Sequence, residues 1–455
     1  MPEVVILGAG LTGLSAAYHL EKSSFFDYAI YEKCDRPGGL LRSFSQDDFT
    51  FDFTGHLLHI NNPDMRAFIS NVLGFENLQI SHRNSAIYSH NTHTNFPYQM
   101  HLYGLPEKVI YECLDGFINR KTHYKKPQNF YDWVHKYFGA GFGKHFFFPY
   151  NSKILAYPVK KIHPSWTGRF VPQTTLKAII HGALRQKSEQ NIGYNSSFYY
   201  PKTGGIETLI KNIITKLKTK IKTKHEAIKI DLENKKIYFS NGHTETYKYL
   251  ITTIPLNELL QKTHNSASTL LQNTAHKLLC TSVINFNLGF AQKHISDRHW
   301  IYYPEKQTPF YRIGFWDQIS QSSVQKNCSA IYGETSYLAG TKTDTQINNL
   351  LEKSIRKSLD ILAIHKSKII TQKILHLKHA YVIYDAWRDK NITKIHQTLS
   401  KKNIYSIGRF GAWRYSSMQE DILDGQNTTN HILLSLNYKK YKHHDFGSQR
   451  GTIAP

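Results

Sequence analysis

The stretch that decides the fold is Val4-Val5-Ile6-Leu7-Gly8-Ala9-Gly10-Leu11-Thr12-Gly13, close to the start of the chain. Its apolar run predicts a buried strand, and the alanine-containing segment after it predicts a helix. Gly8 allows a tight turn, Gly10 lets backbone N–H groups approach a pyrophosphate, and Gly13 allows the helix to pack closely on the strand. Because a helix N-terminus carries partial positive charge, this unit predicts a dinucleotide bound through its phosphates.

A second glycine signal follows the next predicted strand. The apolar run at 28–31 ends at Glu32, about twenty residues after the first glycines, where a carboxylate can hold ribose hydroxyls. Arg36-Pro37-Gly38-Gly39 then follows. This pair of glycines resembles the flavin amine oxidase and UDP-galactopyranose mutase superfamily, and the resemblance favours FAD over NAD.

Composition and charge limit the class of protein. The 455 residues are 40% hydrophobic and 20% charged, which is ordinary for a globular protein of two or three structural units. The 57 Lys and Arg against 34 Asp and Glu give a net charge of +23. Such an excess fits nucleic acid, an anionic membrane surface or an anionic substrate. No nucleic-acid motif accompanies it, so we expect an anionic small ligand, with weak peripheral membrane association.

The cysteines and the apolar runs argue against other classes. The four cysteines show no Cys-x-x-Cys spacing, so we expect neither a metal site nor a disulfide framework. The first predicted strand begins almost at Met1, and no apolar run reaches the roughly 18 residues needed to span a bilayer. The sequence therefore predicts a cytoplasmic protein without a transmembrane segment.

The order of the predicted elements indicates an α/β fold with a discontinuous FAD-binding domain of the Rossmann type. Predicted strands bring residues 1–65, 200–275 and 395–440 into this domain. We expect a mainly helical insertion at 66–199 and a second, antiparallel sheet in a substrate domain at 276–394. A basic tail occupies 441–455.

The run Gly408-Arg409-Phe410-Gly411-Ala412-Trp413-Arg414-Tyr415 makes the resemblance specific. It resembles the UDP-galactopyranose mutases, especially the larger eukaryotic-type enzymes. Further matching segments occur in the same order: Pro149 to Lys153, Trp166 to Gly168, Tyr194-Asn195, and Trp300 to Glu305 followed by Pro309-Phe310-Tyr311-Arg312.

This resemblance implies an isomerase that converts a UDP-hexopyranose to its furanose form. In that family the N5 atom of reduced FAD acts as the nucleophile, there is no net redox change, and the product supplies surface polysaccharide of the cell envelope. UDP must be held while it leaves, a task suited to guanidinium groups and hydroxyls. The implied catalytic residues are His56, Arg312, Arg169, Tyr381 and Tyr415, with Tyr384 as the alternative to Tyr381. The family's second arginine falls one position later, at Phe170 here, so either Arg169 or a neighbour completes the clamp.

The resemblance also implies substrate and cofactor contacts. The implied substrate-binding residues are Tyr98, Gln99, Asn151, Asn195, Tyr302 and Trp300. The implied cofactor-binding residues are Gly8, Gly10, Gly13, Glu32, Gly38, Gly39, Arg42, Gly408, Arg409, Met418 and Gln419. Met418 and Gln419 begin a helix whose positive end would favour negative charge on the reduced flavin. The family's tryptophan near the sugar is Leu155 here, so the sugar pocket differs in shape and the natural sugar stays open.

Two other functions share parts of this pattern. An FAD-dependent oxidase or desaturase of the amine oxidase or protoporphyrinogen oxidase type has the same opening glycines but lacks a diphosphate clamp. A flavin-carrying scaffold protein is the third interpretation. Arg312, Tyr415 and Asn195 together favour the mutase. The electron donor and the oligomeric state are not indicated by the sequence.

Overall fold

A four-stranded parallel sheet joins strands from distant parts of the chain. We analysed a computed structural model, which describes residues 1–120, 126–167, 171–185, 196–264 and 268–438. The sheet has the order β19-β12-β1-β2, and its strands are β1 (Val4–Leu7), β2 (Tyr28–Tyr31), β12 (Tyr249–Thr252) and β19 (Ile404–Ser406). The three longer strands are buried along their whole length, as expected of a sheet covered on both faces. The discontinuous Rossmann-type fold is therefore confirmed.

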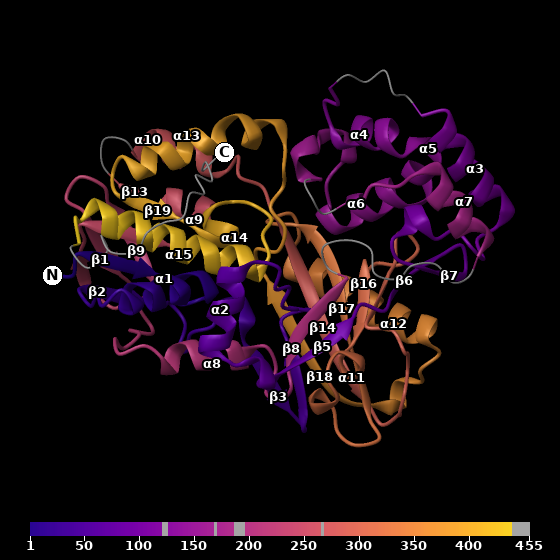
Figure 1. Cartoon of the computed structure of the whole chain (residues 1–455), viewed down its shortest axis with the longest axis horizontal. Helices are drawn as coiled ribbons and strands as arrows, with labels where there is room; N and C mark the ends of the chain where they lie inside the picture. The colour runs from indigo at the N-terminus through magenta and orange to yellow at the C-terminus, as the bar shows by residue number, and fades with distance from the viewer. Residues whose placement is uncertain (121–125, 168–170, 186–195, 265–267, 439–455) are drawn as a thin grey trace.

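Helices from the two ends of the described chain cover this sheet side by side. The helix α1 (Leu11–Lys22) packs against α15 (Met418–Ser435), as Figure 1 shows on its left-hand side. The small residues of both helices allow this, because a Cβ added at Gly425 would lie 2.7 Å from the backbone nitrogen of Ala16. Around them lie α2 (Pro63–Val72), α8 (Glu207–Thr215) and α14 (Gly408–Gly411).

A second four-stranded sheet lies beside the parallel sheet. Its order is β11-β10-β9-β13, formed by β9 (Ala227–Asp231), β10 (Lys236–Phe239), β11 (Thr244–Thr246) and β13 (Thr263–His264). The helices α9 (Leu256–Lys262), α10 (Ser268–Ala275) and α13 (Ala386–Ser400) accompany it. Leu256, Leu259 and Leu260 are fully buried in the core between these elements.

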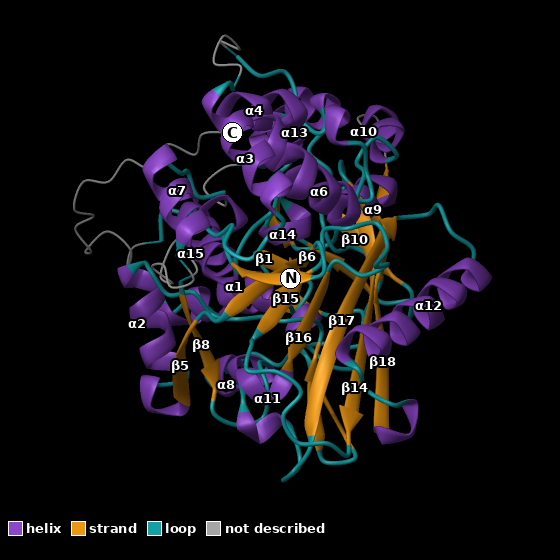
Figure 2. Ribbon diagram, turned by 90° about the vertical axis from the view of Figure 1, so that its right-hand side faces the viewer, coloured by secondary structure: helices purple, strands orange, loops and turns teal. Residues whose placement is uncertain are grey.

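The largest sheet has seven strands in the order β18-β14-β17-β16-β15-β6-β7. Its strands are β14 (Thr281–Phe290), β15 (Trp300–Tyr302), β16 (Arg312–Phe315), β17 (Ser329–Leu338), β18 (Ile369–Leu377), β6 (Ser85–Ser89) and β7 (Thr92–Asn95). All neighbours are antiparallel except β15 and β6. Figure 2 shows its long strands with α12 (Asp344–Leu362) beside them and α11 (Trp316–Ile319) near one end.

Two strands of this sheet come from outside the stretch predicted to form it. Residues 66–199, predicted as mainly helical, supply β6 and β7. These strands form a hairpin through His90 and Asn91, both of which have positive φ, the conformation of the favoured two-residue hairpin turns. The polar sequence Thr-His-Thr-Asn of β7 suits the edge of the sheet and gives no apolar alternation to read.

Most of the described helices of the insertion form a layer at the upper right of Figure 1. It contains α3 (Glu107–Ile118), α4 (Phe130–Tyr137), α5 (Gly139–Phe142), α6 (Phe148–Leu155) and α7 (Leu176–Leu184). Glycines let α3 and α5 approach closely, because a Cβ at Gly139 would lie 1.8 Å from the carbonyl oxygen of Gly116. Two small antiparallel sheets complete the fold: the hairpin of β3 (Ser43–Gln46) with β4 (Phe49–Asp52), and the pair of β5 (Leu78–His82) with the distant β8 (Ser197–Pro201). Within the described ranges, none of the helices is both long and apolar enough to cross a bilayer.

Candidate functional site

A cavity of about 380 Å³ lies at the carboxyl ends of the parallel strands. Gly8, with a φ of 99°, turns the chain from β1 toward α1, and Gly10 and Gly38 meet in an isolated bridge beside the cavity. A Cβ at Gly39 would lie 3.2 Å from the Cα of Gly10, so the two glycine segments approach more closely than side chains would allow. Gly8, Gly10, Gly38 and Gly39 all line the cavity.

Gly13 has the packing role expected from the sequence and does not line the cavity. A Cβ at this position would lie 2.0 Å from the carbonyl oxygen of Gly8 and 3.4 Å from the Ile6 side chain. Only glycine therefore lets the first turn of α1 sit directly on the loop that follows β1.

Glu32 is fixed at the end of β2 with its carboxylate at the cavity wall. Its Oε2 accepts a hydrogen bond from the backbone N–H of Ala9 at 2.8 Å, and its Oε1 accepts one from Cys34 at 2.9 Å. These bonds place acceptor oxygens where ribose hydroxyls would lie. Arg42 also lines the cavity, where its Nε donates to the carbonyl of Gly39 at 3.0 Å.

A second cavity of about 210 Å³ continues from the first, between the start of α15 and the seven-stranded sheet. Six residues line both: Leu40, His56, Leu377, Arg409, Ser416 and Met418. One elongated ligand could therefore extend from the glycine turns into the space in front of the large sheet.

Arg409 stands where the two cavities meet. Its Nη1 donates to the carbonyl of Ser416 at 2.8 Å and its Nη2 to that of Ala380 at 2.9 Å. Its guanidinium lies 4.5 Å from the ring centroid of Tyr415 and 5.3 Å from that of Tyr381. These contacts hold a permanent positive charge at the junction, because arginine stays protonated in proteins.

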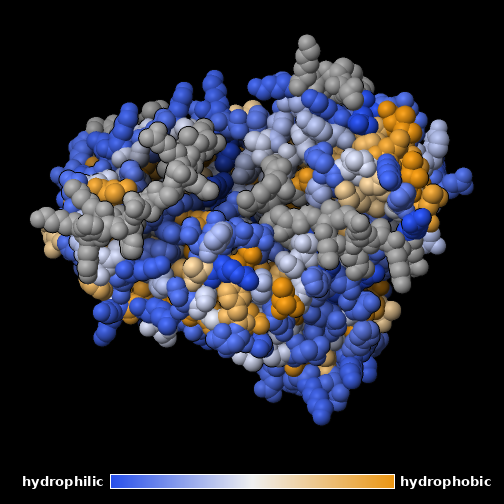
Figure 3. Space-filling view, viewed as in Figure 1, coloured by the Kyte–Doolittle hydropathy of each residue, from blue (hydrophilic) through white to orange (hydrophobic). Residues whose placement is uncertain are grey.

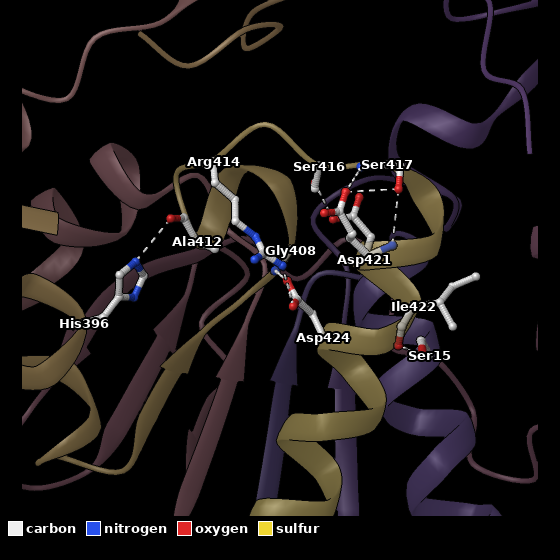
Figure 4. A network of polar contacts seen from close by, with 11 residues as sticks. Ser15, His396, Gly408, Ala412, Arg414, Ser416, Ser417, Asp421, Ile422 and Asp424 are labelled. Carbon is white, nitrogen blue, oxygen red and sulfur yellow. Dashed lines mark hydrogen bonds and ion pairs between the residues drawn. The ribbon is translucent and has the colours of Figure 1, made fainter. Parts of the chain in front are cut away.

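The N-terminus of α15 lies at the same junction, and Figure 4 shows Ser416, Ser417 and Asp421 together at this helix end. Ser417 caps the helix, forming a capping box with Glu420, and the first helical residue, Met418, lines both cavities. Ser416 Oγ donates to Asp421 Oδ1 at 2.6 Å, and burial raises the pKa of Asp421 to about 7. The raised pKa limits the negative charge that this carboxyl places beside the positive helix end.

The side chain of Gln419 is held by backbone groups of the protein. Its Oε1 accepts hydrogen bonds from the backbone of Asn61 at 2.8 Å and Asn62 at 3.1 Å, which tie α15 to the start of α2. Its side chain lines neither cavity. Gly408, whose φ is 76°, turns the chain at the wall of the first cavity, and its N–H donates to Asp424 at 3.1 Å.

His56 lies between the two cavities in its neutral form. Burial, together with the nearby positive charge of Arg409, lowers the pKa of His56 to about 4. The imidazole can therefore donate or accept one hydrogen bond at neutral pH without adding a charge to the wall.

Arg312 projects into the second cavity from the first residue of β16. Its Nε and Nη2 each donate at 2.8 Å to the carboxylate of Glu334, which is directly opposite in the register of β16 and β17. Glu334 is fully buried. Nη1 has no hydrogen-bond partner within the part of the chain that the structure describes, so it is the group on Arg312 available to a ligand.

Stacked phenols form the adjacent wall. The rings of Tyr381 and Tyr415 lie 6.0 Å apart with an interplanar angle of 14°, and Tyr311 meets Tyr381 edge-on at 6.2 Å. Burial raises the pKa of Tyr381, so its hydroxyl stays protonated. Of the two alternatives named from the sequence, Tyr381 lines the cavity. Tyr384 instead accepts a hydrogen bond from the backbone N–H of Tyr415 at 2.8 Å and lines neither cavity.

The predicted substrate residues divide into two groups. Trp300 and Tyr302 line the second cavity. Tyr98, Gln99 and Asn151 are buried away from both cavities: Tyr98 stacks on Phe146 at 5.1 Å, Gln99 donates to the Pro172 carbonyl, and Asn151 accepts from Trp166 Nε1. These contacts lie within the helical layer, and the exposed fractions of the three residues are 0%, 2% and 9%. Arg169 and Asn195 lie outside the described residues.

Several lining residues were not among the sequence predictions, and three of them carry phenol or carboxylate groups: Tyr311, Tyr332 and Glu334. Tyr311 directly precedes Arg312, so the motif contained it. Glu334 and Tyr332 become visible only from strand pairing, because β17 lies far along the chain from Arg312. Among the described residues no three acidic, histidine or cysteine side chains are grouped so as to hold a metal ion.

The residues of the first cavity fit a flavin dinucleotide. The close-packed glycines leave room for a pyrophosphate, Glu32 offers ribose acceptors, and Arg409 with the end of α15 offers positive charge at the far end. A family model described as flavin containing amine oxidoreductase matches residues 11–366. The chain belongs to this family.

Its relatives within and beyond the family differ in coverage. Reduced UDP-galactopyranose mutase has a similar structure, with a TM-score of 0.88 and 26% identity over 98% of this chain and 100% of that one. Putrescine oxidase bound to putrescine has a TM-score of 0.63 at 14% identity over 95% of this chain and 99% of that one, which shows a shared fold. The protein is thus a flavin enzyme with the mixed α/β fold of UDP-galactopyranose mutase, within the amine oxidase superfamily.

Curated relatives match over short stretches. The Arabidopsis thaliana protein named probable polyamine oxidase 4 is 27% identical over 117 residues, which is 26% of this chain and 23% of that protein. Coproporphyrinogen III oxidase of Staphylococcus aureus is 42% identical over 50 residues, 11% of each chain. The chain therefore spans about a quarter and about a tenth of the lengths of these relatives.

Proposed function

We propose that this enzyme converts a UDP-hexopyranose, UDP-galactopyranose or a close analogue, to the furanose form without net redox change. The observation that carries the proposal is the charge of the second cavity. Its wall has two guanidinium groups, Arg312 and Arg409, and one carboxylate, Glu334, among the described residues. A net positive, phenol-lined wall suits a diphosphate leaving group and disfavours a cationic amine.

Arg312 would hold the diphosphate through Nη1. The two bonds to Glu334 fix the plane of the guanidinium before the ligand arrives, so little side-chain freedom is lost on binding. Tyr381 and Tyr415 line the same cavity, and their hydroxyls would donate to phosphate oxygens that gain charge as UDP departs.

The cofactor end of the site favours a negatively charged flavin. When bound and reduced, FAD would supply an electron-rich nucleophile facing the sugar. Arg409 and the N-terminus of α15 would stabilise the negative charge of the flavin. Neutral His56 would orient the flavin through a single hydrogen bond. The large aromatic wall of Trp300 and Tyr302 would exclude water from the sugar.

We further propose a cytoplasmic enzyme that needs FAD in the reduced state, receives electrons from a separate donor, and supplies a precursor for cell-envelope polysaccharide. The alternative is an FAD-dependent oxidase or desaturase, which the family assignment and the short matches to oxidases favour.

One experiment separates the two. The purified protein is incubated with UDP-galactose, with and without dithionite, and the sugar nucleotides are separated chromatographically. The mutase proposal requires a furanose product that forms only after reduction. Reduction of the oxidised flavin by an amine or a porphyrinogen, with no isomerised product, would establish the oxidase.

A matched pair of variants tests the role of the wall. Arg312→Ala should lower turnover about a hundredfold, as expected for loss of one preorganised donor to a developing charge. Arg356→Ala removes an exposed arginine of α12 and should leave turnover unchanged. If the two variants were equally active, Arg312 would not be part of the proposed diphosphate clamp.

A further inference from the structure

The helix α7 presents an apolar ridge to solvent. Leu176, Ile180 and Leu184 recur every four residues, so their side chains share one side of the helix. All three are exposed, and Leu184 is 72% exposed. Within the described ranges no hydrophobic cluster includes any of them.

A basic ridge runs directly beside it. Lys177, His181 and Arg185 follow the apolar residues one position later with the same spacing, and all three are exposed. The helix contains no acidic residue. Its outward side therefore pairs a row of aliphatic side chains with a row of basic ones.

The opposite side of α7 is already occupied by the body of the protein. Ile179 is fully buried, and a Cβ added at Gly182 would lie 1.8 Å from the carbonyl oxygen of Met100. The backbone N–H groups of Leu102 and Tyr103 both donate to the carbonyl of Gly182, at 2.9 and 2.8 Å. The helix cannot rotate to bury the apolar ridge without breaking these contacts.

Two exposed tyrosines extend the surface. Tyr103 is held beside α7 by its bond to Gly182, and Tyr111 is 66% exposed on α3, which packs against α7. Figure 3 shows hydrophobic side chains gathered at the right-hand end of the helical layer, around the position of α3 in Figure 1. Tyrosine suits the boundary between lipid headgroups and acyl chains, because one end is apolar and the other polar.

We propose that this surface, formed by the outward side of α7 with Tyr103 and Tyr111, docks on an anionic lipid bilayer. The aliphatic ridge would enter the boundary of the acyl chains while Lys177 and Arg185 meet lipid phosphates. The net charge of +23 draws the whole molecule toward such a surface. A second copy of the chain is disfavoured as the occupant, because pairing two such surfaces would bring basic ridges together.

The proposal is tested by sedimentation of the full-length flavoprotein with vesicles of phosphatidylcholine, with and without phosphatidylserine. Binding is expected only to the anionic vesicles and should weaken as salt is raised. The double variant Ile180→Ser with Leu184→Ser should bind at least about tenfold more weakly, and so should Lys177→Glu with Arg185→Glu.

Matched controls separate the surface from general charge and hydrophobicity. The first control, Ile228→Ser with Ile370→Ser, removes two exposed isoleucines from β9 and β18. The second, Lys353→Glu with Arg356→Glu, makes the same charge change on α12 as the basic α7 variant makes. Both controls should bind vesicles nearly as well as the unmodified protein. Thermal unfolding and retained flavin establish that every variant is folded.

Three results would overturn the proposal. The first is that the protein binds neutral vesicles as strongly as anionic ones, or binds neither kind. The second is an equal loss of binding in the α12 control, which would assign binding to net charge. The third is concentration-dependent dimerisation, seen by light scattering, that the α7 variants abolish, because the surface would then join two copies.

Discussion

Replacing Glu334 by glutamine tests the electrostatic basis of the second cavity. Glu334 is fully buried, the Arg312 side chain is 18% exposed, and two bonds of 2.8 Å join them. Removing one partner of such a pair leaves an uncompensated, poorly hydrated charge, which lowers stability by about 3–5 kcal/mol. Because glutamine keeps one acceptor oxygen, we expect the free energy of unfolding to decrease by about 3 kcal/mol.

The measurement is urea unfolding of the flavin-saturated protein, followed by tryptophan fluorescence. The expected loss corresponds to a change of about 150-fold in the folding equilibrium. The control is Glu3→Gln, which removes the partner of Lys248 in a solvent-exposed pair and should change stability by less than about 1 kcal/mol.

A second measurement examines the ligand side of the same pair. Without the carboxylate, the charge of Arg312 is unbalanced, so a bound diphosphate should stabilise the variant more than the unmodified protein. UDP should therefore raise the melting temperature of Glu334→Gln by a larger amount. The reasoning would be refuted if Glu334→Gln and Glu3→Gln unfolded alike, or if UDP stabilised the variant and the unmodified protein equally.

Three further predictions concern other parts of the molecule. Gly13→Ala should purify with little flavin and unfold at a lower temperature, because its Cβ would lie 2.0 Å from the Gly8 carbonyl; visible absorbance and calorimetry measure this. Burial lowers the pKa of His299 to about 4 in the folded protein. As the pH falls below about 6.5, the unfolded chain takes up a proton on this histidine before the folded protein does. The free energy of unfolding should therefore decrease by about 3 kcal/mol between about pH 6.5 and 4. Unfolding of the unmodified protein and of His299→Asn across that range should show a smaller acid loss in the variant, and parallel curves would contradict it. Tyr381→Phe should raise the KM for the UDP-sugar about tenfold, from loss of about one hydrogen bond, whereas Tyr384→Phe should lower the melting temperature with a smaller change in KM. An unchanged KM for both variants would exclude Tyr381 from the phosphate contact.

The sequence predicted the cofactor half of the molecule well, because local physics decides it. Gly8, Gly10 and Gly13 act through backbone conformation and close approach within one βα unit, and Glu32 is fixed by the end of its own strand. Such features need no knowledge of distant segments. The boundaries of β1 and β2 also agree with the predicted ones, because each is a short apolar run with clear ends.

The substrate half was harder to predict because its contacts join distant segments. Glu334 meets Arg312 only through the register of β16 with β17, and Tyr332 reaches the cavity through the same pairing. Tyr98 shows the opposite problem, since an aromatic residue in a loop reads equally well as a ligand contact or as core. Its complete burial against Phe146 follows from how the helical layer packs, which local sequence does not encode.

The strand order β19-β12-β1-β2 has a consequence for synthesis on the ribosome. The chain makes β1 long before residues 249–252 of its neighbour β12, and α15, which packs on α1, is complete only after residue 435 has been made. The cofactor pocket therefore cannot close before its lining residues at 407–421 have been made. A nascent chain halted before β19 would leave the apolar edge of β12 open to pairing with other chains.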